Sequence, residues 1–283
     1  MVRVWQATVL VTALGAGLTG AGPAPAATGP SAENPVANQA PVPTSPPVGT
    51  PDSGNRFVAL GDSYASGVGA GDYLPDSGTC LRSMAGYPQG LVAVRTDLIL
   101  DNRSCAGATT ADVLVDQVAA LGTDTRLVTL TVGGNDAGFS QTMGACVVGG
   151  EQACLDAVRE GESFARSQLP ALLTEVFTAV RTGAPGAVVY VLGYPHIFET
   201  GPTCPDSPLG HRSRAAVNRG SDTLDTVLAE AASDHGFVFV DVRETFDGHG
   251  VCSADPWVPG GTDPGYESFH PSAAGQRTGY RDA

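Results

Sequence analysis

The chain has 283 residues and a formal net charge of −14, and every one of its 15 basic side chains is an arginine. Such an acidic chain lacks the basic surface that nucleic-acid-binding proteins need, so we expect no nucleic-acid partner. Without lysine it also cannot contain a Walker-type phosphate-binding loop.

Residues 1–27 have the organisation of a secretory signal peptide. Arg3 supplies the positive charge, an apolar segment spans 7–22, and Ala24-Pro25-Ala26 offers small residues for cleavage. A membrane anchor is the alternative, but the apolar segment is short and contains several Gly and Thr residues. We therefore predict a secreted protein with no transmembrane segment in its mature chain.

The rest of the chain divides into two regions of different composition. Residues 28–55 are rich in Pro, Ala, Ser and Thr and contain almost no large apolar side chains, so they cannot bury enough surface to fold. We predict a disordered linker or pro-segment there. Residues 56–283 are long enough for one α/β domain with a sizeable core, which we expect to be monomeric.

Short apolar runs that end in polar or Gly-rich turns predict the strands of this domain. The first run ends in Gly61-Asp62-Ser63, and the third ends in Gly133-Gly134-Asn135-Asp136. Because helical patterns separate the runs, we predict a three-layer α/β/α domain with a mainly five-stranded parallel sheet. The predicted strands are residues 57–60, 98–102, 126–132, 187–192 and 237–242.

The segments between the strands have mostly helical spacing. Thr109 or Thr110 can cap the helix that follows the second strand, and Pro170 predicts a break within a long helical stretch. Cys146 to Cys154 is typical of a small loop closed by a disulfide, and 244–270 is irregular. The predicted helices are residues 87–97, the segment after Thr110, and residues 151–182, 211–235 and 271–280.

Six cysteines in a chain with an export signal indicate disulfide bonds. Six cysteines allow fifteen pairings, and we favour the short-range pairing in chain order. A zinc site is the alternative, but the sequence has no Cys-x-x-Cys spacing, so we expect no metal. The predicted bonds are Cys80–Cys105, Cys146–Cys154 and Cys204–Cys252.

Polar groups at the predicted strand ends indicate acyl-transfer chemistry. Ser63 follows the first strand, Gly107 lies in the turn after the second, and Asn135 follows the third. The carboxyl ends of parallel strands share the edge of the sheet where ligands bind. A serine hydroxyl needs a base to become nucleophilic, and His270 can be that base. The Asn135 amide and the backbone N–H groups of Gly107 and Ser63 can stabilise the resulting oxyanion.

Each of these residues also has a purely structural interpretation. Ser63 can simply cap the following helix, and Asn135 can form an Asx turn. His270 alone would more often be a surface residue or the start of a helix. We interpret Asp62 and Asp136 as residues that hold loop geometry, because aspartate is common in turns.

The order of these motifs resembles that of the SGNH hydrolases, also called the GDSL esterase/lipase family. The resemblance spans nearly the whole folded region. Its four blocks correspond to Gly61-Asp62-Ser63, Asn102 to Gly107, Gly133 to Asp136, and His270-Pro271.

This resemblance implies an SGNH/flavodoxin-like fold and carboxylic ester hydrolysis without a cofactor. It implies Ser63 as the nucleophile, His270 as the base, and Gly107 and Asn135 as oxyanion donors. The six cysteines and Gly193-Tyr194-Pro195 further resemble the secreted actinobacterial lipase and phospholipase branch, in which three sequential disulfides occur.

Glu267 departs from the family pattern, in which many members place an Asp three residues before the His to orient the imidazole. The Glu267 carboxylate can take that role with a longer side chain. As in the secreted branch, a backbone carbonyl oxygen can replace it, either that of Glu267 or that of Ser268.

Other polar and aromatic side chains have weaker functional interpretations. His249 and Asp247 are too few ligands for a metal site. Trp257 and Phe269, near the predicted base, can line an acyl groove, although core packing is the commoner fate of aromatic side chains. The histidines that we expect to be solvated or capping are His196, His211 and His235.

We therefore expect a secreted lipase or esterase that cleaves fatty acyl esters through an acyl-enzyme on Ser63. The resembled branch implies lipid substrates, namely triacylglycerols, simple fatty esters or phospholipids. Phospholipase A-type or polysaccharide O-acetyl esterase activity at the same site is an alternative. A non-catalytic extracellular binding module is the alternative from another class, because a fold does not imply a function.

Overall fold

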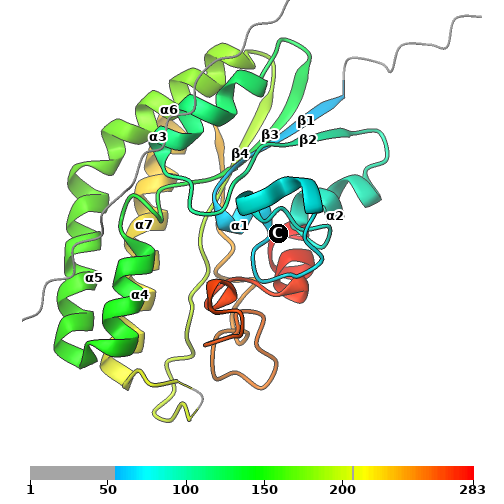
Figure 1. Ribbon diagram of the computed structural model, residues 1–283. Coiled ribbons are helices and arrows are strands. Elements are labelled where there is room, and N and C mark those ends of the chain that lie inside the picture. Colours follow the sequence, from blue (N-terminus) through cyan, green and yellow to red (C-terminus); the bar gives the residue numbers. More distant parts are fainter. Residues whose placement is uncertain (1–54, 206) are drawn as a thin grey trace, which may run out of the picture. The chain divides into compact units, whose positions relative to one another are not determined.

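The computed structural model describes residues 55–205 and 207–283 (Figure 1). The predicted signal peptide, residues 1–27, lies outside the described residues, as does the predicted linker, 28–55, except for its last residue. Both therefore remain predictions.

Short strands form a single parallel sheet at the centre of the domain (Figure 1). They are β1 Arg56–Gly61, β2 Ile99–Asn102, β3 Thr125–Thr131, β4 Val188–Leu192 and β5 Val238–Val240. The five strands lie in the order β2-β1-β3-β4-β5, so the predicted five-stranded parallel sheet is confirmed. β1 is buried from Phe57 to Gly61, as expected of an inner parallel strand covered on both faces.

Seven α-helices and several tighter or wider turns connect the strands of the described part of the chain. The α-helices are α1 Ser63–Ser66, α2 Tyr87–Val94, α3 Thr110–Asp112, α4 Phe139–Val148, α5 Gly150–Ser167, α6 Leu169–Gly183 and α7 His211–Asp234. The other helical segments are η1 Pro75–Cys80, η2 Val113–Gln117, η3 Val118–Ala120, η4 Gly265–Glu267 and η5 Gly275–Arg281.

Helices cover both faces of the sheet, as the predicted three-layer architecture requires (Figure 1). On one face α2 packs on η5, and on the other α6 packs against α3 and α7. α5 packs on α4 and on α7. Figure 1 shows α4 and α5 side by side, reaching past the carboxyl ends of the strands, so they can form a wall next to the site.

The segment from Cys146 to Cys154 is helical, which makes the prediction of a small stapled loop wrong. Cys146 lies in α4 and Cys154 in α5, and the chain reverses between them at Gly149 and Gly150. Gly150 has a φ of 77°, which glycine adopts without strain because it has no Cβ. The Cys146–Cys154 disulfide therefore joins the ends of two packed helices.

The helix predicted over 151–182 is interrupted near Pro170, as expected. α5 ends at Ser167 and α6 begins at Leu169, so Pro170 lies in the first turn of α6. A proline is well accommodated there, because the N–H groups of the first turn have no partner within the helix.

The helix after β2 begins as predicted but is irregular. Thr109 caps α3 and forms a reciprocal capping box with Asp112. A π turn, η2, follows and ends at Gln117, whose side-chain amide bonds both backbone groups of Gly61, at 2.7 and 2.9 Å. The irregular turn thus fixes the carboxyl end of β1, directly before Ser63.

The prediction of three disulfides is confirmed. They join Cys80 to Cys105, Cys146 to Cys154 and Cys204 to Cys252. The first bond ties η1 to the turn that contains Gly107, which is one of the predicted site residues.

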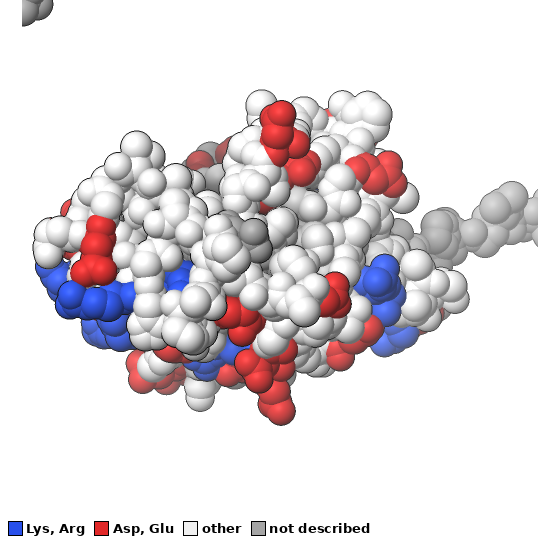
Figure 2. Space-filling model, turned by 90° about the horizontal axis from the view of Figure 1, so that it is seen from below, with Lys and Arg blue, Asp and Glu red and all other residues white. Residues whose placement is uncertain are grey.

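Positively and negatively charged side chains lie close to one another on the surface. On the face seen in Figure 2, arginine side chains lie beside carboxylates rather than forming a separate basic area. Within residues 55–205 and 207–283, no helix combines the length and the apolar character needed to cross a membrane.

Candidate active site

Ser63 is the first residue of α1, two residues after β1 ends at Gly61, and its hydroxyl faces His270. The Ser63 Oγ and His270 Nε2 atoms are 2.8 Å apart. The carboxylate of Asp62, not Ser63, caps α1, because Asp62 accepts a 2.9 Å hydrogen bond from the Tyr64 backbone N–H. The interpretation of Ser63 as a mere helix cap is therefore wrong.

His270 is oriented by a backbone carbonyl. Its Nδ1 atom lies 3.0 Å from the carbonyl oxygen of Ser268. A carbonyl oxygen can only accept, so this contact places the imidazole proton on Nδ1 and leaves Nε2 free to accept the Ser63 proton. The pair therefore has the tautomer that a general base needs.

The carboxylate of Glu267 does not contact the imidazole. Its Oε1 atom accepts a 2.7 Å hydrogen bond from the hydroxyl of Tyr73, which in turn accepts one from the Gly69 N–H. The backbone oxygen of Glu267 accepts from the backbone N–H of His270. Of the three orienting groups that the sequence left open, only the carbonyl of Ser268 contacts the His270 ring.

The backbone before His270 is bent into an unusual conformation. Phe269 has a φ of 62°, which costs a bulky residue roughly 1–2 kcal/mol. Its carbonyl oxygen accepts a 2.9 Å hydrogen bond from the hydroxyl of Tyr64, which holds the bend. The bend allows the carbonyl oxygen of Ser268 to accept a hydrogen bond from the His270 ring, two residues later in the chain.

The predicted aromatic groove near the base is not formed. The Phe269 ring packs in the core, with its centroid 5.8 Å from that of Phe198. Trp257 stacks on His249 at 3.6 Å between ring centroids. Both aromatic rings therefore pack within the fold, which is the commoner fate of aromatic side chains, and neither lines the pocket beside Ser63.

Burial lowers the pKa of His270 from 6.5 to about 4. The Ser268 carbonyl and the negative charge of Glu267 act in the opposite direction and partly offset this effect. The imidazole is therefore neutral, and able to accept a proton, across most of the acidic range as well as at neutral pH.

Asn135 and Gly107 lie in neighbouring turns beyond β3 and β2. The side-chain amide nitrogen of Asn135 donates one 2.9 Å hydrogen bond to the carbonyl of Ala108, which fixes the amide and leaves its second N–H available. Gly107 has a φ of 81°, and no atom lies within 4 Å of the place a Cβ would occupy. A substrate atom can therefore approach the backbone of Gly107.

Asp136 connects these two turns. Its carboxylate accepts hydrogen bonds from the backbone N–H of Thr110, at 3.0 Å, and from the Thr110 hydroxyl, at 2.6 Å. The predicted role of Asp136 in loop geometry is thus confirmed.

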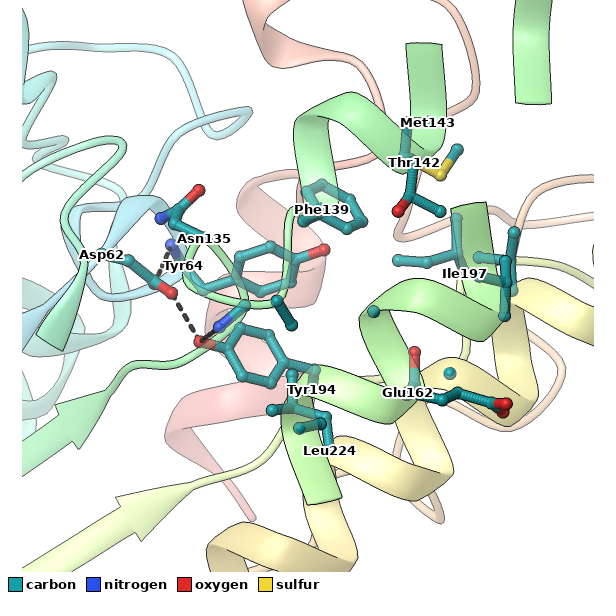
Figure 3. A pocket seen from close by; sticks show the side chains of 18 of the residues that line it. Asp62, Tyr64, Asn135, Phe139, Thr142, Met143, Glu162, Tyr194, Ile197 and Leu224 are labelled. Carbon is teal, nitrogen blue, oxygen red and sulfur yellow. Dashed lines mark hydrogen bonds between the residues drawn. The ribbon is translucent and has the colours of Figure 1, made fainter. Parts of the chain in front are cut away.

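Asp62 is almost fully buried and connects three strand ends. Its carboxylate accepts a hydrogen bond from the Thr131 hydroxyl at 2.7 Å. It also accepts one from the Tyr194 hydroxyl at 2.5 Å (Figure 3). Burial raises the pKa of Asp62 to about 6, and these two hydrogen bonds limit the rise. The predicted structural role of Asp62 is confirmed: its carboxylate caps α1 and joins the end of β1 to the residues at the ends of β3 and β4.

Tyr194 is the residue of this network that sequence reasoning missed. Its hydroxyl contacts Asp62 and also accepts from the N–H of Gly134, the residue before Asn135. The only signal was the Gly193-Tyr194-Pro195 stretch, which the resemblance to the secreted branch had singled out. Nothing in that stretch indicated a contact with the residues on either side of the site.

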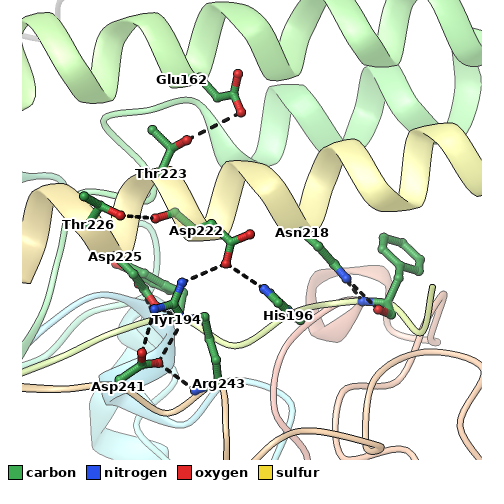
Figure 4. Close-up of polar contacts among 11 residues, drawn as sticks. Glu162, Tyr194, His196, Asn218, Asp222, Thr223, Asp225, Thr226, Asp241 and Arg243 are labelled. Carbon is green, nitrogen blue, oxygen red and sulfur yellow. Dashed lines mark hydrogen bonds and ion pairs between the residues drawn. The ribbon is translucent and has the colours of Figure 1, made fainter.

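Tyr194 is itself anchored from the far side (Figure 4). Its backbone N–H donates to the buried carboxylate of Asp225 at 2.8 Å, and Arg243 lies 3.4 Å from the other oxygen of that carboxylate. Burial raises the pKa of Asp225 to about 8. Arg243 also pairs with Asp222 and Asp241, which fixes its guanidinium behind β4 and β5, next to the Asp225 carboxyl group that anchors Tyr194.

A mostly apolar pocket opens beside Ser63 (Figure 3). Its empty volume is about 730 Å³, including its opening to solvent. α4, α5 and α7 form its far walls, and Tyr64 and Tyr194 line it near the sheet. Apolar residues among its walls include Phe139, Met143, Val158, Ala165, Ile197, Val217 and Leu224.

The remaining histidines have local roles. His235 follows α7 and its Nδ1 atom contacts the Ala231 carbonyl at 2.8 Å, and His196 pairs with Asp222 at 2.8 Å. His249 contacts the carbonyl of Asp255. In the part of the chain that the structure describes, no group of three or more His, Cys, Asp or Glu side chains is arranged to hold a metal ion.

Known proteins resemble this chain over most of the described domain. The model of the GDSL-like lipase/acylhydrolase family matches residues 59–278. A lipase of Streptomyces rimosus is 46% identical over 224 residues, which covers 79% of this chain and 83% of that protein.

Two solved structures share the fold. The extracellular lipase from Streptomyces rimosus has a TM-score of 0.79 and 45% identity, covering 81% of this chain and 97% of the other. Phospholipase A1 from Streptomyces albidoflavus NA297 has a TM-score of 0.78 and 42% identity, with the same two coverages of 81% and 97%.

Proposed function

Because the chain belongs to the GDSL-like lipase/acylhydrolase family and is a carboxylic ester hydrolase, we propose that it cleaves fatty acyl esters through an acyl-enzyme on Ser63. The observation that supports this most directly is the 2.8 Å contact between Ser63 Oγ and His270 Nε2. The two residues are 207 positions apart, so the fold as a whole creates the pair.

In the proposed reaction, Ser63 Oγ attacks the ester carbonyl carbon while His270 Nε2 accepts its proton. The imidazolium then donates that proton to the leaving alcohol, and the carbonyl of Ser268 accepts a hydrogen bond from Nδ1 throughout. Water, activated by the same imidazole, hydrolyses the acyl-enzyme. The low pKa of His270 favours the neutral form with which acylation and deacylation both begin.

We assign the oxyanion of the tetrahedral intermediate to three donors. One is the second N–H of the Asn135 amide, whose first N–H is fixed on Ala108. The others are the backbone N–H groups of Gly107 and of Ser63. Ser63 begins α1, where backbone N–H groups have no acceptor within the helix.

The apolar pocket beside Ser63 favours acyl groups with many methylene groups. Each methylene that leaves water for such a pocket contributes about 0.8 kcal/mol of binding free energy. Fatty acyl lipids offer such chains, and the names of the relatives include both a lipase and a phospholipase A1. An acetyl group would leave most of the pocket empty. We therefore rank polysaccharide O-acetyl esterase activity below the hydrolysis of fatty acyl esters.

We also propose that the protein is secreted. Three disulfides persist best in an oxidising compartment outside the cytosol, and the Streptomyces rimosus relative is named an extracellular lipase.

A fluorophosphonate reagent, which reacts with activated serines, tests the proposal. We expect it to label the folded wild-type protein and to leave Ser63→Ala unlabelled. The same variant should lose hydrolysis of p-nitrophenyl esters and phosphatidylcholine. Ser66→Ala is the matched control, because Ser66 lies on the same short helix and its hydroxyl donates to the backbone carbonyl of Ser63, not to the Ser63 hydroxyl or to His270. Labelling that persists in Ser63→Ala would overturn the assignment, and an unlabelled wild type would favour a binding module.

A further inference from the structure

Two helices, α5 and α7, each present a glycine to the pocket. Gly161 and Gly220 are each the second of the four pocket-lining residues of their helix. The pocket-lining residues of α5 and of α7 follow the i, i+3, i+4, i+7 spacing of a single helical face. They are Val158, Gly161, Glu162 and Ala165 on α5, and Val217, Gly220, Ser221 and Leu224 on α7.

Packing explains Gly161. A Cβ at this position would lie 2.8 Å from the backbone carbonyl oxygen of Ala137, a distance at which the backbone would have to move. Glycine therefore allows the turn before α4 to approach α5 closely, whatever the pocket binds.

Packing does not explain Gly220. A Cβ there would meet only Val158 Cγ1, at 3.7 Å, which is an ordinary van der Waals contact. Its φ is not in the positive range that favours glycine. Gly220 lies within a 24-residue helix, where glycine is among the poorest helix formers. The missing side chain thus weakens α7, and the space it leaves belongs to the pocket.

We propose that Gly220 determines how long an acyl chain the pocket accepts. This inference rests on the proposed hydrolysis of acyl esters at Ser63, because the pocket includes both residues. A linear acyl chain leaving the Ser63 carbonyl site extends toward the pocket-lining faces of α5 and α7, and its distal end lies against Gly220, where Val158 approaches from α5 and closes the pocket. A side chain at position 220 occupies the same space and excludes the distal methylene groups.

Substitution of Gly220 by Leu tests the proposal on p-nitrophenyl esters with C4 and C12 acyl chains. Each buried methylene changes kcat/KM roughly fourfold, so exclusion of two lowers the C12-to-C4 ratio about fifteenfold. Gly144→Leu is the matched control, because Gly144 lies in α4, is exposed, and would place its Cβ in open space outside the pocket. We expect its ratio to stay within about twofold of the wild-type value.

Gly220→Ala provides the second readout and decides the question if the Leu variant does not fold. We expect its melting temperature to rise by about 2 to 4 °C, as for Gly144→Ala, because alanine favours the helix. Its C12-to-C4 ratio should fall about fourfold. A lower melting temperature, or an unchanged ratio in a folded Gly220→Leu, would overturn the assignment. Ester hydrolysis that persists in Ser63→Ala would count against the proposed function instead.

Discussion

The two halves of the site, the Ser63 side and the His270 side, are held in different ways. On the Ser63 side, the buried Asp62 carboxylate connects β1 to the ends of β3 and β4 through Thr131 and Tyr194. On the His270 side, an irregular segment carries the base, and the ring is positioned by the carbonyl of a residue two positions earlier.

The two residues therefore differ in what fixes their positions: the whole sheet for Ser63, and a few neighbouring residues for His270. The position of Ser63 depends on sheet register and on the buried Asp62 carboxylate. Many residues therefore fix this position together, and no single one determines it alone. The position of His270 depends on one strained residue, Phe269, and on the hydroxyl of Tyr64 that holds its carbonyl. The contact between Ser63 and His270 is the point where the two supports meet.

Removal of the base should have the largest effect and tests whether the two halves form one catalytic unit. We expect His270→Ala to lower kcat for a p-nitrophenyl ester by about 10⁴- to 10⁶-fold. The free energy of unfolding should fall by about 1 kcal/mol, because the variant loses the hydrogen bond between His270 Nδ1 and the Ser268 carbonyl. A loss below about tenfold, in protein with a native circular dichroism spectrum, would contradict the role of His270.

Tyr194→Phe should have an intermediate effect and tests the support on the Ser63 side. The change removes the donor to Asp62 and the acceptor for the Gly134 N–H. We expect kcat to fall about tenfold at constant KM, because small shifts at the reacting atoms are costly. The pKa of Asp62 should rise further above about 6, because a hydrogen bond that favours its charged form is lost. An NMR titration of the Asp62 carboxyl group in the two proteins should show this rise directly.

Tyr87→Phe is the matched control for this prediction. Tyr87 is also a buried tyrosine, and its hydroxyl donates to Thr129 at 3.1 Å rather than to Asp62. Tyr87→Phe should lose about 1 kcal/mol of unfolding free energy with its hydrogen bond, and Tyr194→Phe should lose more, because two hydrogen bonds are removed and one of them is to a buried carboxylate. Equal kinetic losses in the two variants would mean that Tyr194 has only a structural role.

The same contrast explains what could be predicted from the sequence. The strands follow from continuous apolar runs, and the polar residues at their ends mark the site because parallel strands end at one edge. The conformation of Phe269 and the carbonyl of Ser268 have no sequence signal, because any residue supplies a carbonyl. Tyr194 was missed because its partners lie on other strands. The helix over 151–182 was predicted, but α4 was missed and the segment between Cys146 and Cys154 was interpreted as a loop.

Glu267→Gln should have the smallest effect and sharpens the account of the His270 side. Glutamine can still accept the hydrogen bond from Tyr73, so the loop geometry is kept while the negative charge is removed. That charge raises the pKa of His270, so its loss should lower this pKa further below about 4. Activity requires the neutral imidazole and rises with pH through its pKa, so the acidic limb of the pH–kcat/KM profile should move to lower pH.

At neutral pH the imidazole is neutral in both proteins, and we expect Glu267→Gln to lower kcat by only about threefold. Tyr73→Phe provides the reverse control, because it removes the hydrogen bond to Glu267 but keeps the charge, so the acidic limb should not shift to lower pH. A fall in kcat on the order of 10⁴-fold in Glu267→Gln would instead identify the carboxylate as the group that orients the base. In that case the carbonyl of Ser268 would no longer explain the His270 side, and both halves of the site would depend on a buried or part-buried carboxylate.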